Sequence, residues 1–328
     1  MNLPTDYHAA LAGAALIDEP NAGRIIMHGR DRAALLQRLT TNDIERLRPG
    51  HGLTTVLTTP IGRIIDLLFV YAREDSLVVL TSPGQGPAIF SHLKKNIFFN
   101  DQVTLEPAGR SLTQFGLFGP KARTILESIN TVPLPELALH QHTLLSPAAG
   151  LGRAIRRAGI GVAPGARPDE AEGWTILIPS EAAEPFRANL LAAGVVPLSP
   201  ATYETLRIEA AIPAIGHELS QEYIPLETGL LGAISFSKGC YVGQEIIARM
   251  ESRGRRAKQL CLLTLSAPTD APAKLAVEGK EAGDLTSTTH SPRHGPLGLA
   301  YVRSAHAEVG STIGIAERDI HGQIIAVI

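Results

Sequence analysis

The residues best suited to chemistry form the segment Lys238-Gly239-Cys240-Tyr241-Val242-Gly243-Gln244-Glu245, which we call the signature segment (residues 238–245). Cys240 stands between a glycine and an aromatic residue, so we expect it in a turn rather than inside an element. Gly243 is predicted to open a helix, and the positive helix end together with Lys238 favours a thiolate at Cys240. Such a thiolate can attack an electrophile, bind a metal transiently or exchange with a disulfide. The alternative is that Cys240 is a small buried side chain in a tight turn.

The second cysteine, Cys261, falls in the apolar strand pattern 259–263, where it is expected to serve packing. Two cysteines are too few for a disulfide framework or a four-thiolate cluster, and a reducing compartment fits this usage. The 11 histidines show no metal-ligand spacing with a second His or Cys, so no metal site is predicted.

The elements that must position these residues change in character along the chain. Residues 32–39 and 89–97 read as amphipathic helices, and three strand-like runs between them read as an antiparallel meander over 53–59, 63–72 and 76–81. A strand over 112–118 and a helix opened by Ser199-Pro200 follow, whereas residues 130–172 are expected to be loops. After Arg256, short strands separated by Gly and Pro predict a small all-β domain.

Composition limits the function classes. With 328 residues the chain is expected to hold two or three domains, and we place a boundary near 252–257. The net charge of −2 argues against stable nucleic-acid binding. We expect no membrane span, because no run of about 20 apolar residues exists. The N-terminus does not read as a targeting peptide, so a cytoplasmic location is expected.

The signature segment closely resembles the signature of YgfZ-type folate-binding proteins, and it is similar to a Lys-x-x-Phe-Ile-Gly segment of the glycine-cleavage T-protein, an aminomethyltransferase. Further segments agree with that superfamily in the same order along the chain, namely 39–43, 62–65, 206–210, 224–230 and 283–287. The resemblance therefore covers nearly the whole chain.

The resemblance implies an α+β fold with antiparallel-rich folate-binding lobes around a central cavity. It predicts two intertwined lobes over residues 1–252 and a C-terminal β-barrel over residues 257–328. The implied cofactor is tetrahydrofolate or a derivative, and Cys240 is the candidate reactive thiol. The implied folate-binding residues are Asp66, Arg207, Glu227, Lys238 and Tyr241.

Two strand positions decide what chemistry the resemblance supports. In the transferases an Asp on the strand that follows the matched glycine lies beside the reacting folate nitrogen. Aligned on Gly62, that position holds Leu67, with Asp66 one residue earlier, and strand alternation would point Asp66 away from the cavity. An apolar side chain can neither take a proton nor stabilise a cation, so we expect no aminomethyl transfer. The alternative for Asp66 is a carboxylate on the strand surface.

Arg207 matches an Arg that contacts folate in the transferases, and a guanidinium can clamp a carboxylate through two parallel hydrogen bonds. The alternative is an ion pair with Glu204, three residues earlier on the same helix. The pterin-binding Glu of the transferases falls near Ala171, and the adjacent Glu170 and Glu172 are not clean matches.

The function implied by the resemblance is a tetrahydrofolate-binding accessory protein that supports iron–sulfur cluster assembly or repair, including enzymes that modify tRNA. Its expected partners are a reduced folate and iron–sulfur enzymes as clients. The alternatives are a folate-dependent aminomethyltransferase or other one-carbon transferase, and a module that kept the fold but lost the ligand.

Overall fold

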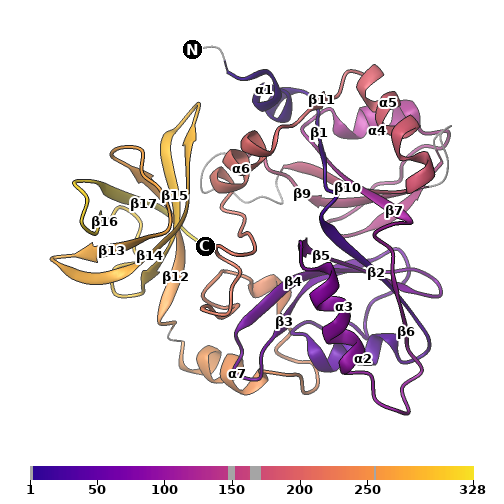
Figure 1. Cartoon of the computed structure of the whole chain (residues 1–328), viewed down its shortest axis with the longest axis horizontal. Helices are drawn as coiled ribbons and strands as arrows, with labels where there is room; N and C mark the ends of the chain where they lie inside the picture. Colours follow the sequence, from indigo (N-terminus) through magenta and orange to yellow (C-terminus); the bar gives the residue numbers. More distant parts are fainter. Residues whose placement is uncertain (1–2, 147–151, 163–170, 255) are drawn as a thin grey trace.

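The computed structural model describes residues 3–146, 152–162, 171–254 and 256–328. These residues form a five-stranded sheet, a six-stranded sheet and a closed barrel. Figure 1 shows the barrel beside the two sheets, which lie one above the other on the right-hand side. The expected α+β class, the antiparallel-rich lobes and the C-terminal β-barrel are confirmed.

The five-stranded sheet has the order β3-β4-β5-β2-β6, with every neighbouring pair antiparallel. Alternation along β4 packs Leu68 and Val70 against two helices, while Leu67 and Phe69 face the other side. The elements are β2 (Ala22–His28), β3 (Gly52–Thr58), β4 (Ile64–Ala72), β5 (Leu77–Pro83) and β6 (Thr104–Pro107), with helices α2 (Arg32–Leu39) and α3 (Gly86–Lys95).

The six-stranded sheet has the order β11-β1-β7-β10-β9-β8, and it is antiparallel except for the β1–β11 pair. Its core holds Phe115, Trp174 and Phe186, all fully or nearly fully buried. The elements are β1 (Ala15–Asp18), β7 (Leu112–Phe118), β8 (His142–Leu145), β9 (Gly152–Ala158), β10 (Glu172–Pro179) and β11 (Val196–Pro197), with helices α4 (Ala122–Ile129) and α5 (Ala183–Ala192).

Residues 19–21 carry the chain from one sheet to the other, because β1 ends at Asp18 and β2 begins at Ala22. The backbone N–H of Glu19 donates to the Gln114 carbonyl at 3.0 Å, which extends the pairing of β1 with β7 by one residue. The Glu19 side chain therefore stands at the junction of the two sheets.

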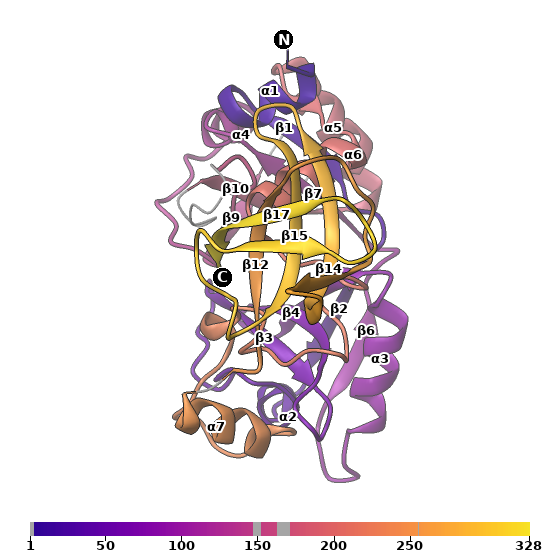
Figure 2. The same cartoon turned by 90° about the vertical axis from the view of Figure 1, so that its left-hand side faces the viewer.

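The barrel closes in the order β12-β15-β14-β13-β16-β17. Its interior is filled by buried aliphatic side chains such as Leu263, Leu285 and Ile324. Figure 2 places the barrel in front of the sheets when the molecule is turned by 90°. The strands are β12 (Lys258–Leu265), β13 (Ala273–Val277), β14 (Lys280–Ser291), β15 (Gly295–Arg303), β16 (Thr312–Ile315) and β17 (His321–Val327).

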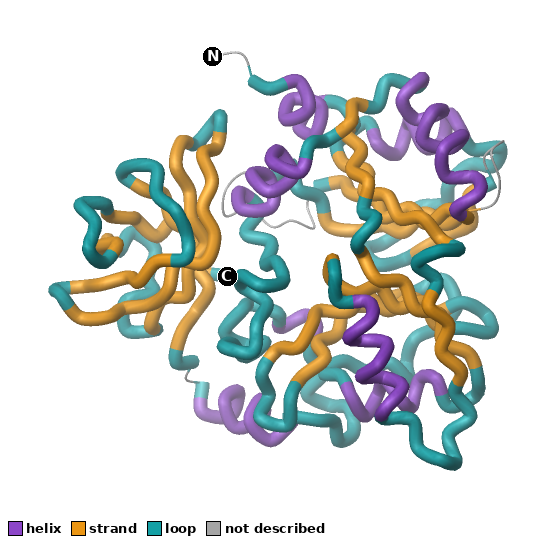
Figure 3. Tube along the Cα trace, viewed as in Figure 1, coloured by secondary structure: helices purple, strands orange, loops and turns teal. Residues whose placement is uncertain are grey.

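The barrel is attached to the sheets through α6 (Pro200–Glu209) and the long connection from α6 to α7 (Gln244–Arg253), which Figure 3 draws mostly as loop. The hydroxyls of Thr205 on α6 and Thr289 on β14 lie 2.7 Å apart. The rings of Tyr223 in the connection and Tyr301 on β15 stack with centroids 3.4 Å apart. Helix α1 (Thr5–Ala12) and the short 3-10 helices Ser180–Ala182 and Leu231–Ala233 complete the elements.

The prediction that residues 130–172 are loops is wrong for β8 and β9. Strand β9 pairs with β10 along its length. Three arginines, Arg153, Arg156 and Arg157, interrupt its apolar pattern, so hydrophobic periodicity does not predict this strand. Residues 147–151 and 163–170 of that span lie outside the described residues.

Candidate functional site

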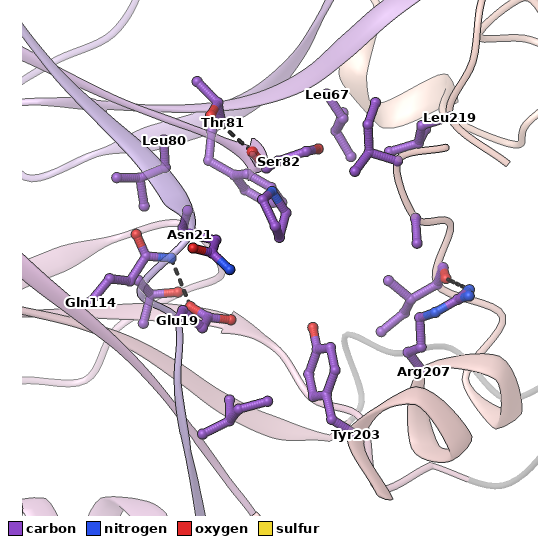
Figure 4. A pocket seen from close by; sticks show the side chains of 18 of the residues that line it. Glu19, Asn21, Leu67, Leu80, Thr81, Ser82, Gln114, Tyr203, Arg207 and Leu219 are labelled. Atoms are coloured by element: carbon purple, nitrogen blue, oxygen red, sulfur yellow. Dashed lines mark hydrogen bonds between the residues drawn. The ribbon is translucent and has the colours of Figure 1, made fainter. Parts of the chain in front are cut away.

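A cavity of about 590 Å³ lies where the two sheets, α6 and the connection after α6 meet. Figure 4 shows Glu19, Asn21 and Gln114 together on one side of this space and Arg207 and Leu219 across from them. Much of its wall is apolar, formed by Ile17, Leu67, Phe69, Leu80, Ile212, Ile215 and Leu219.

The side of the cavity near the sheet junction is polar. The Glu19 carboxylate accepts a hydrogen bond from Gln114 Nε2 at 2.7 Å and lies 3.2 Å from an Arg157 guanidinium nitrogen. The same Arg157 nitrogen lies 3.4 Å from the Thr175 hydroxyl, and the guanidinium stands over the Phe118 ring at 5.0 Å. Gln114 on β7 and Arg157 on β9 thus hold the Glu19 carboxylate in one orientation, and Thr175 on β10 in turn contacts Arg157.

Two buried polar atoms in the cavity wall have no hydrogen-bond partner among the described residues: the Tyr71 hydroxyl and Gln114 Oε1. Tyr71 is 2% exposed and Gln114 is 6% exposed. Burial raises the pKa of Tyr71 above its ordinary value of 10.0, so the hydroxyl keeps its proton at neutral pH. Buried polar groups without partners are uncommon and costly, by about 1–3 kcal/mol each.

Arg207 lines the opposite side of the cavity, but its guanidinium is already occupied. Its Nε and one terminal nitrogen donate to Glu204, and further donations reach the Ile212 carbonyl at 3.2 Å, Glu218 at 3.1 Å and the Ser287 hydroxyl at 2.9 Å. These bonds account for the five N–H donors of a guanidinium. The pairing with Glu204 that was weighed as an alternative is present, and the folate-clamping role requires one of these bonds to open.

Strand β4 presents Leu67, and not Asp66, to the cavity. Asp66 is fully buried, and its carboxylate accepts from the backbone N–H of Leu67 at 2.9 Å and of Ser82 at 3.1 Å. Burial raises the pKa of Asp66 from 3.8 to about 6 and outweighs the hydrogen bonds from Ser82 and Leu67, which lower it. It is a buried carboxylate that joins β4 to β5, not the exposed strand-surface group of the alternative interpretation.

No residue of the signature segment lines the cavity. Lys238 Nζ donates to three backbone carbonyls around the end of α2, those of Gln37 at 2.6 Å and of Thr40 and Asn42 at 2.7 Å each. Its nitrogen also stands 5.0 Å from the Tyr241 ring centroid. Burial lowers the pKa of Lys238 to about 8.

The remaining predicted site residues, Tyr241, Glu227 and Cys240, also lie outside the cavity wall. Tyr241 packs in a small apolar cluster with Ile224 and Ile247. Glu227 is buried and accepts from the Ile224 backbone N–H at 3.1 Å. Cys240 is exposed, so it is not a buried packing residue. Of the residues assigned to folate from the resemblance, the structure thus brings Arg207 alone to this cavity.

Cys261 is fully buried in the barrel, and burial raises its thiol pKa to about 12. It behaves as the packing residue that its strand pattern predicts. Among the described residues, no group of three or more His, Cys, Asp or Glu could hold a metal ion. In the same part of the chain, no helix is long and apolar enough to cross a membrane.

Sequence reasoning missed Glu19, Gln114 and Arg157. They lie on segments separated by 95 and 43 residues, and none belongs to a recognisable motif. The one available signal was a run of three arginines within 153–157 in a segment that is otherwise small and apolar. Among the candidates for the pterin-binding Glu, Glu172 accepts from the Trp174 indole at 3.1 Å, and Glu170 lies outside the described residues.

Comparisons with known proteins agree with this architecture. A family described as the GCVT N-terminal domain matches residues 3–153. A putative chloroplastic transferase of Arabidopsis thaliana is 34% identical over 316 residues, which cover 94% of this chain and 70% of that protein. An aminomethyltransferase of Listeria monocytogenes is 30% identical over 331 residues, covering 98% and 88% of the two chains.

The fold has a counterpart among solved structures. The glycine cleavage system aminomethyltransferase T from Bartonella henselae superimposes with a TM-score of 0.84 at 20% identity, covering 98% of this chain and 87% of that one. The arrangement of two sheets and a barrel is therefore shared along nearly the whole chain.

Proposed function

Because the chain belongs to the aminomethyltransferase-like family of the glycine-cleavage T-protein, we propose that its cavity binds a reduced folate. Proteins of this family bind tetrahydrofolate derivatives. The observation that carries the proposal is the cavity of about 590 Å³ with apolar and aromatic walls and one polar side. Cavities of roughly 300–1,000 Å³ with a few convergent polar groups are typical of small-molecule sites.

Calorimetric titration with tetrahydrofolate and with its stable 5-formyl derivative tests this proposal. Ala214 lines the cavity, and Ala214→Trp fills part of it, so binding should fall at least tenfold. Ala188→Trp on the exposed side of α5 is the matched control and should bind like the parent. Equal affinity of the Ala214→Trp variant and the parent would place the ligand elsewhere.

We propose further that the folate is bound without aminomethyl transfer. Among the described residues lining the cavity, the carboxylates belong to Asp18, Glu19 and Glu204. Each of these carboxylates lies 3.3 Å or less from an arginine nitrogen, so each is already paired within the protein. The side chain that β4 directs into this space is the apolar Leu67.

An accessory role in iron–sulfur cluster assembly or repair, including tRNA-modifying enzymes, is the finer function that we propose. Its support is the resemblance of the signature segment and the exposed position of Cys240, which a client protein can reach. Both cysteines are free, which suits the reducing cytoplasm. In a deletion strain, the parent should restore iron–sulfur enzyme activity and Cys240→Ala should not. Full restoration by Cys240→Ala would show that the Cys240 thiol is not needed for this role.

The competing function is one-carbon transfer, which is favoured by the names of the relatives. It predicts measurable glycine-cleavage turnover when the partner proteins and a lipoyl carrier are supplied. Turnover at a rate comparable to that of a relative would overturn the non-transferase proposal while leaving folate binding intact.

A further inference from the structure

A second cavity, of about 450 Å³, lies between the start of α3, the beginning of β2 and the chain that leaves β6. Residues 20–22 line both this cavity and the larger one of about 590 Å³, so this crossover segment is a wall common to the two. Among the described residues that line the second cavity, none was assigned to folate from the resemblance. Its apolar wall is formed by Pro20, Ala22, Ile25, Pro87, Phe90 and Pro107.

Arg24 lines the second cavity and is a buried cation, since it is only 5% exposed. Its guanidinium donates to the backbone carbonyls of Glu19 at 3.2 Å, Pro20 at 3.3 Å and Gly109 at 3.2 Å. A guanidinium has five N–H donors, and Nε of Arg24 has no partner among the described residues. Part of its hydrogen-bonding capacity is therefore unused.

The charge of Arg24 is also not neutralised by a direct partner. Within the described part of the chain Arg24 forms no ion pair, and the carboxylate of the nearby Glu19 is engaged by Gln114 and Arg157. Burial lowers the pKa of Arg24 more than the Glu19 charge raises it. Because buried charges are as a rule paired with an opposite charge, an anion in the second cavity would complete this arrangement.

The start of α3 adds a second positive group to the same cavity. Gly86 and Pro87 line it, and the first N–H groups of a helix have no acceptor within the helix and carry partial positive charge. A Cβ on Gly23 of β2 would lie 2.5 Å from the Gly86 Cα, so the absence of a side chain lets the helix start approach β2. Arg24 is the next residue on that strand.

We propose that the second cavity binds a small monocarboxylate with an apolar body. The carboxylate pairs with Arg24, whose guanidinium matches it in charge and planar shape, and the body packs on Phe90 and Ile25. The single buried cation and the apolar wall favour a singly charged group over a phosphate. The volume falls within the roughly 300–1,000 Å³ that is typical of small-molecule sites. This site does not depend on the proposed folate function.

Calorimetry with benzoate and with benzamide, its uncharged analogue, tests the proposal. We expect the parent to bind benzoate about tenfold or more tighter than benzamide, since only benzoate offers a charge-assisted hydrogen bond.

Gly109→Leu is the cleanest variant, because an added Cβ meets the Arg24 guanidinium at 3.7 Å and no closer atom. It keeps the Gly109 carbonyl that Arg24 uses and fills the space beside the guanidinium, so benzoate affinity should fall about tenfold or more. Gly232→Leu is the matched control, since a Cβ at Gly232 also meets open space, and it should bind benzoate like the parent.

Arg24→Met removes the charge and keeps an apolar stem of similar length. Benzoate affinity should fall about tenfold or more, and benzamide affinity should be unchanged. If this variant unfolds because the carbonyls of both crossover segments lose their donor, Gly109→Leu decides the question.

Three results overturn the inference: no binding of benzoate by the parent, equal affinity for benzoate and benzamide, or unchanged benzoate affinity in Gly109→Leu. Benzoate binding that is lost in Ala214→Trp but kept in Gly109→Leu would place the probe in the larger cavity and would also overturn it. Titration with tetrahydrofolate is the independent measurement. If the parent binds benzoate as expected but not tetrahydrofolate, the proposed function fails and this inference stands.

Discussion

The signature segment and the cavity differ in how their polar groups are used. In the signature segment, Lys238 gives all three ammonium protons to backbone carbonyls at the end of α2. In the cavity, the Tyr71 hydroxyl and Gln114 Oε1 stay unpaired among the described residues. Satisfied buried groups stabilise a fold, and unsatisfied ones cost stability that a ligand or an ordered water restores by pairing with them.

A segment that is easy to recognise in the sequence is therefore not the same as a segment that lines the cavity. The segment that is easiest to identify in the sequence joins α2 to the connection that precedes α7, and the cavity wall is built from residues that no motif contains. Arg207 lies between these cases, since it lines the cavity and yet is saturated by protein partners. The following predictions test this division, from the largest expected effect to the smallest.

Arg207→Ala should lower the free energy of unfolding by about 3–5 kcal/mol, because it leaves the fully buried Glu218 without its cationic partner. Urea denaturation measures this change. Arg187→Ala, which breaks a more exposed pair with Asp18, is the control and should cost at most about 1 kcal/mol. A stable Arg207→Ala variant that has lost only ligand affinity would show that Arg207 is a ligand clamp after all.

Lys238→Met should cost about 2–4 kcal/mol, since hydrogen bonds to a charged donor are lost and three carbonyls lose their partner. The folded fraction should bind folate as tightly as the parent. The exposed Lys95→Met is the control. Normal stability combined with weakened folate binding would place Lys238 at the ligand and would contradict the difference between the signature segment and the cavity.

Asp66 should make stability depend on pH. Its folded pKa of about 6 lies above the ordinary 3.8, so the folded state holds a proton that the unfolded state has released. The contribution is fully present below pH 3.8 and is lost as the pH rises through 6, by about 2 kcal/mol between pH 4 and 7. The stability difference between the parent and Asp66→Asn, measured across this range, should show the change; a flat difference contradicts it.

Cys240→Ala should change the free energy of unfolding by less than about 0.5 kcal/mol, because the side chain is exposed. In the parent, alkylation should modify Cys240 well before Cys261, which is buried with a pKa near 12. Mass mapping of the first modified site checks the order. A large loss of stability in Cys240→Ala would show that this thiol, like Lys238, contributes to the stability of the fold.

The sequence by itself predicted much of the architecture. The meander over β3 to β5, helix α2 and the change to short strands after Arg256 follow from local hydrophobic period and turn residues. The contrast between Cys240 and Cys261 was also readable from their neighbours. These features depend on a few consecutive residues, and local patterns record them.

Only the tertiary structure decided which side chains form the cavity. The pairing of β1 with β7, and of β7 with β10 and β10 with β9, brings Glu19, Gln114 and Arg157 together. Likewise, the connection after α6 and strand β14 bring Glu218 and Ser287 to Arg207, and the end of α2 supplies the partners of Lys238. Local period determines which residues face inward, but strand order and register determine what they face, and these depend on contacts between segments far apart in the chain.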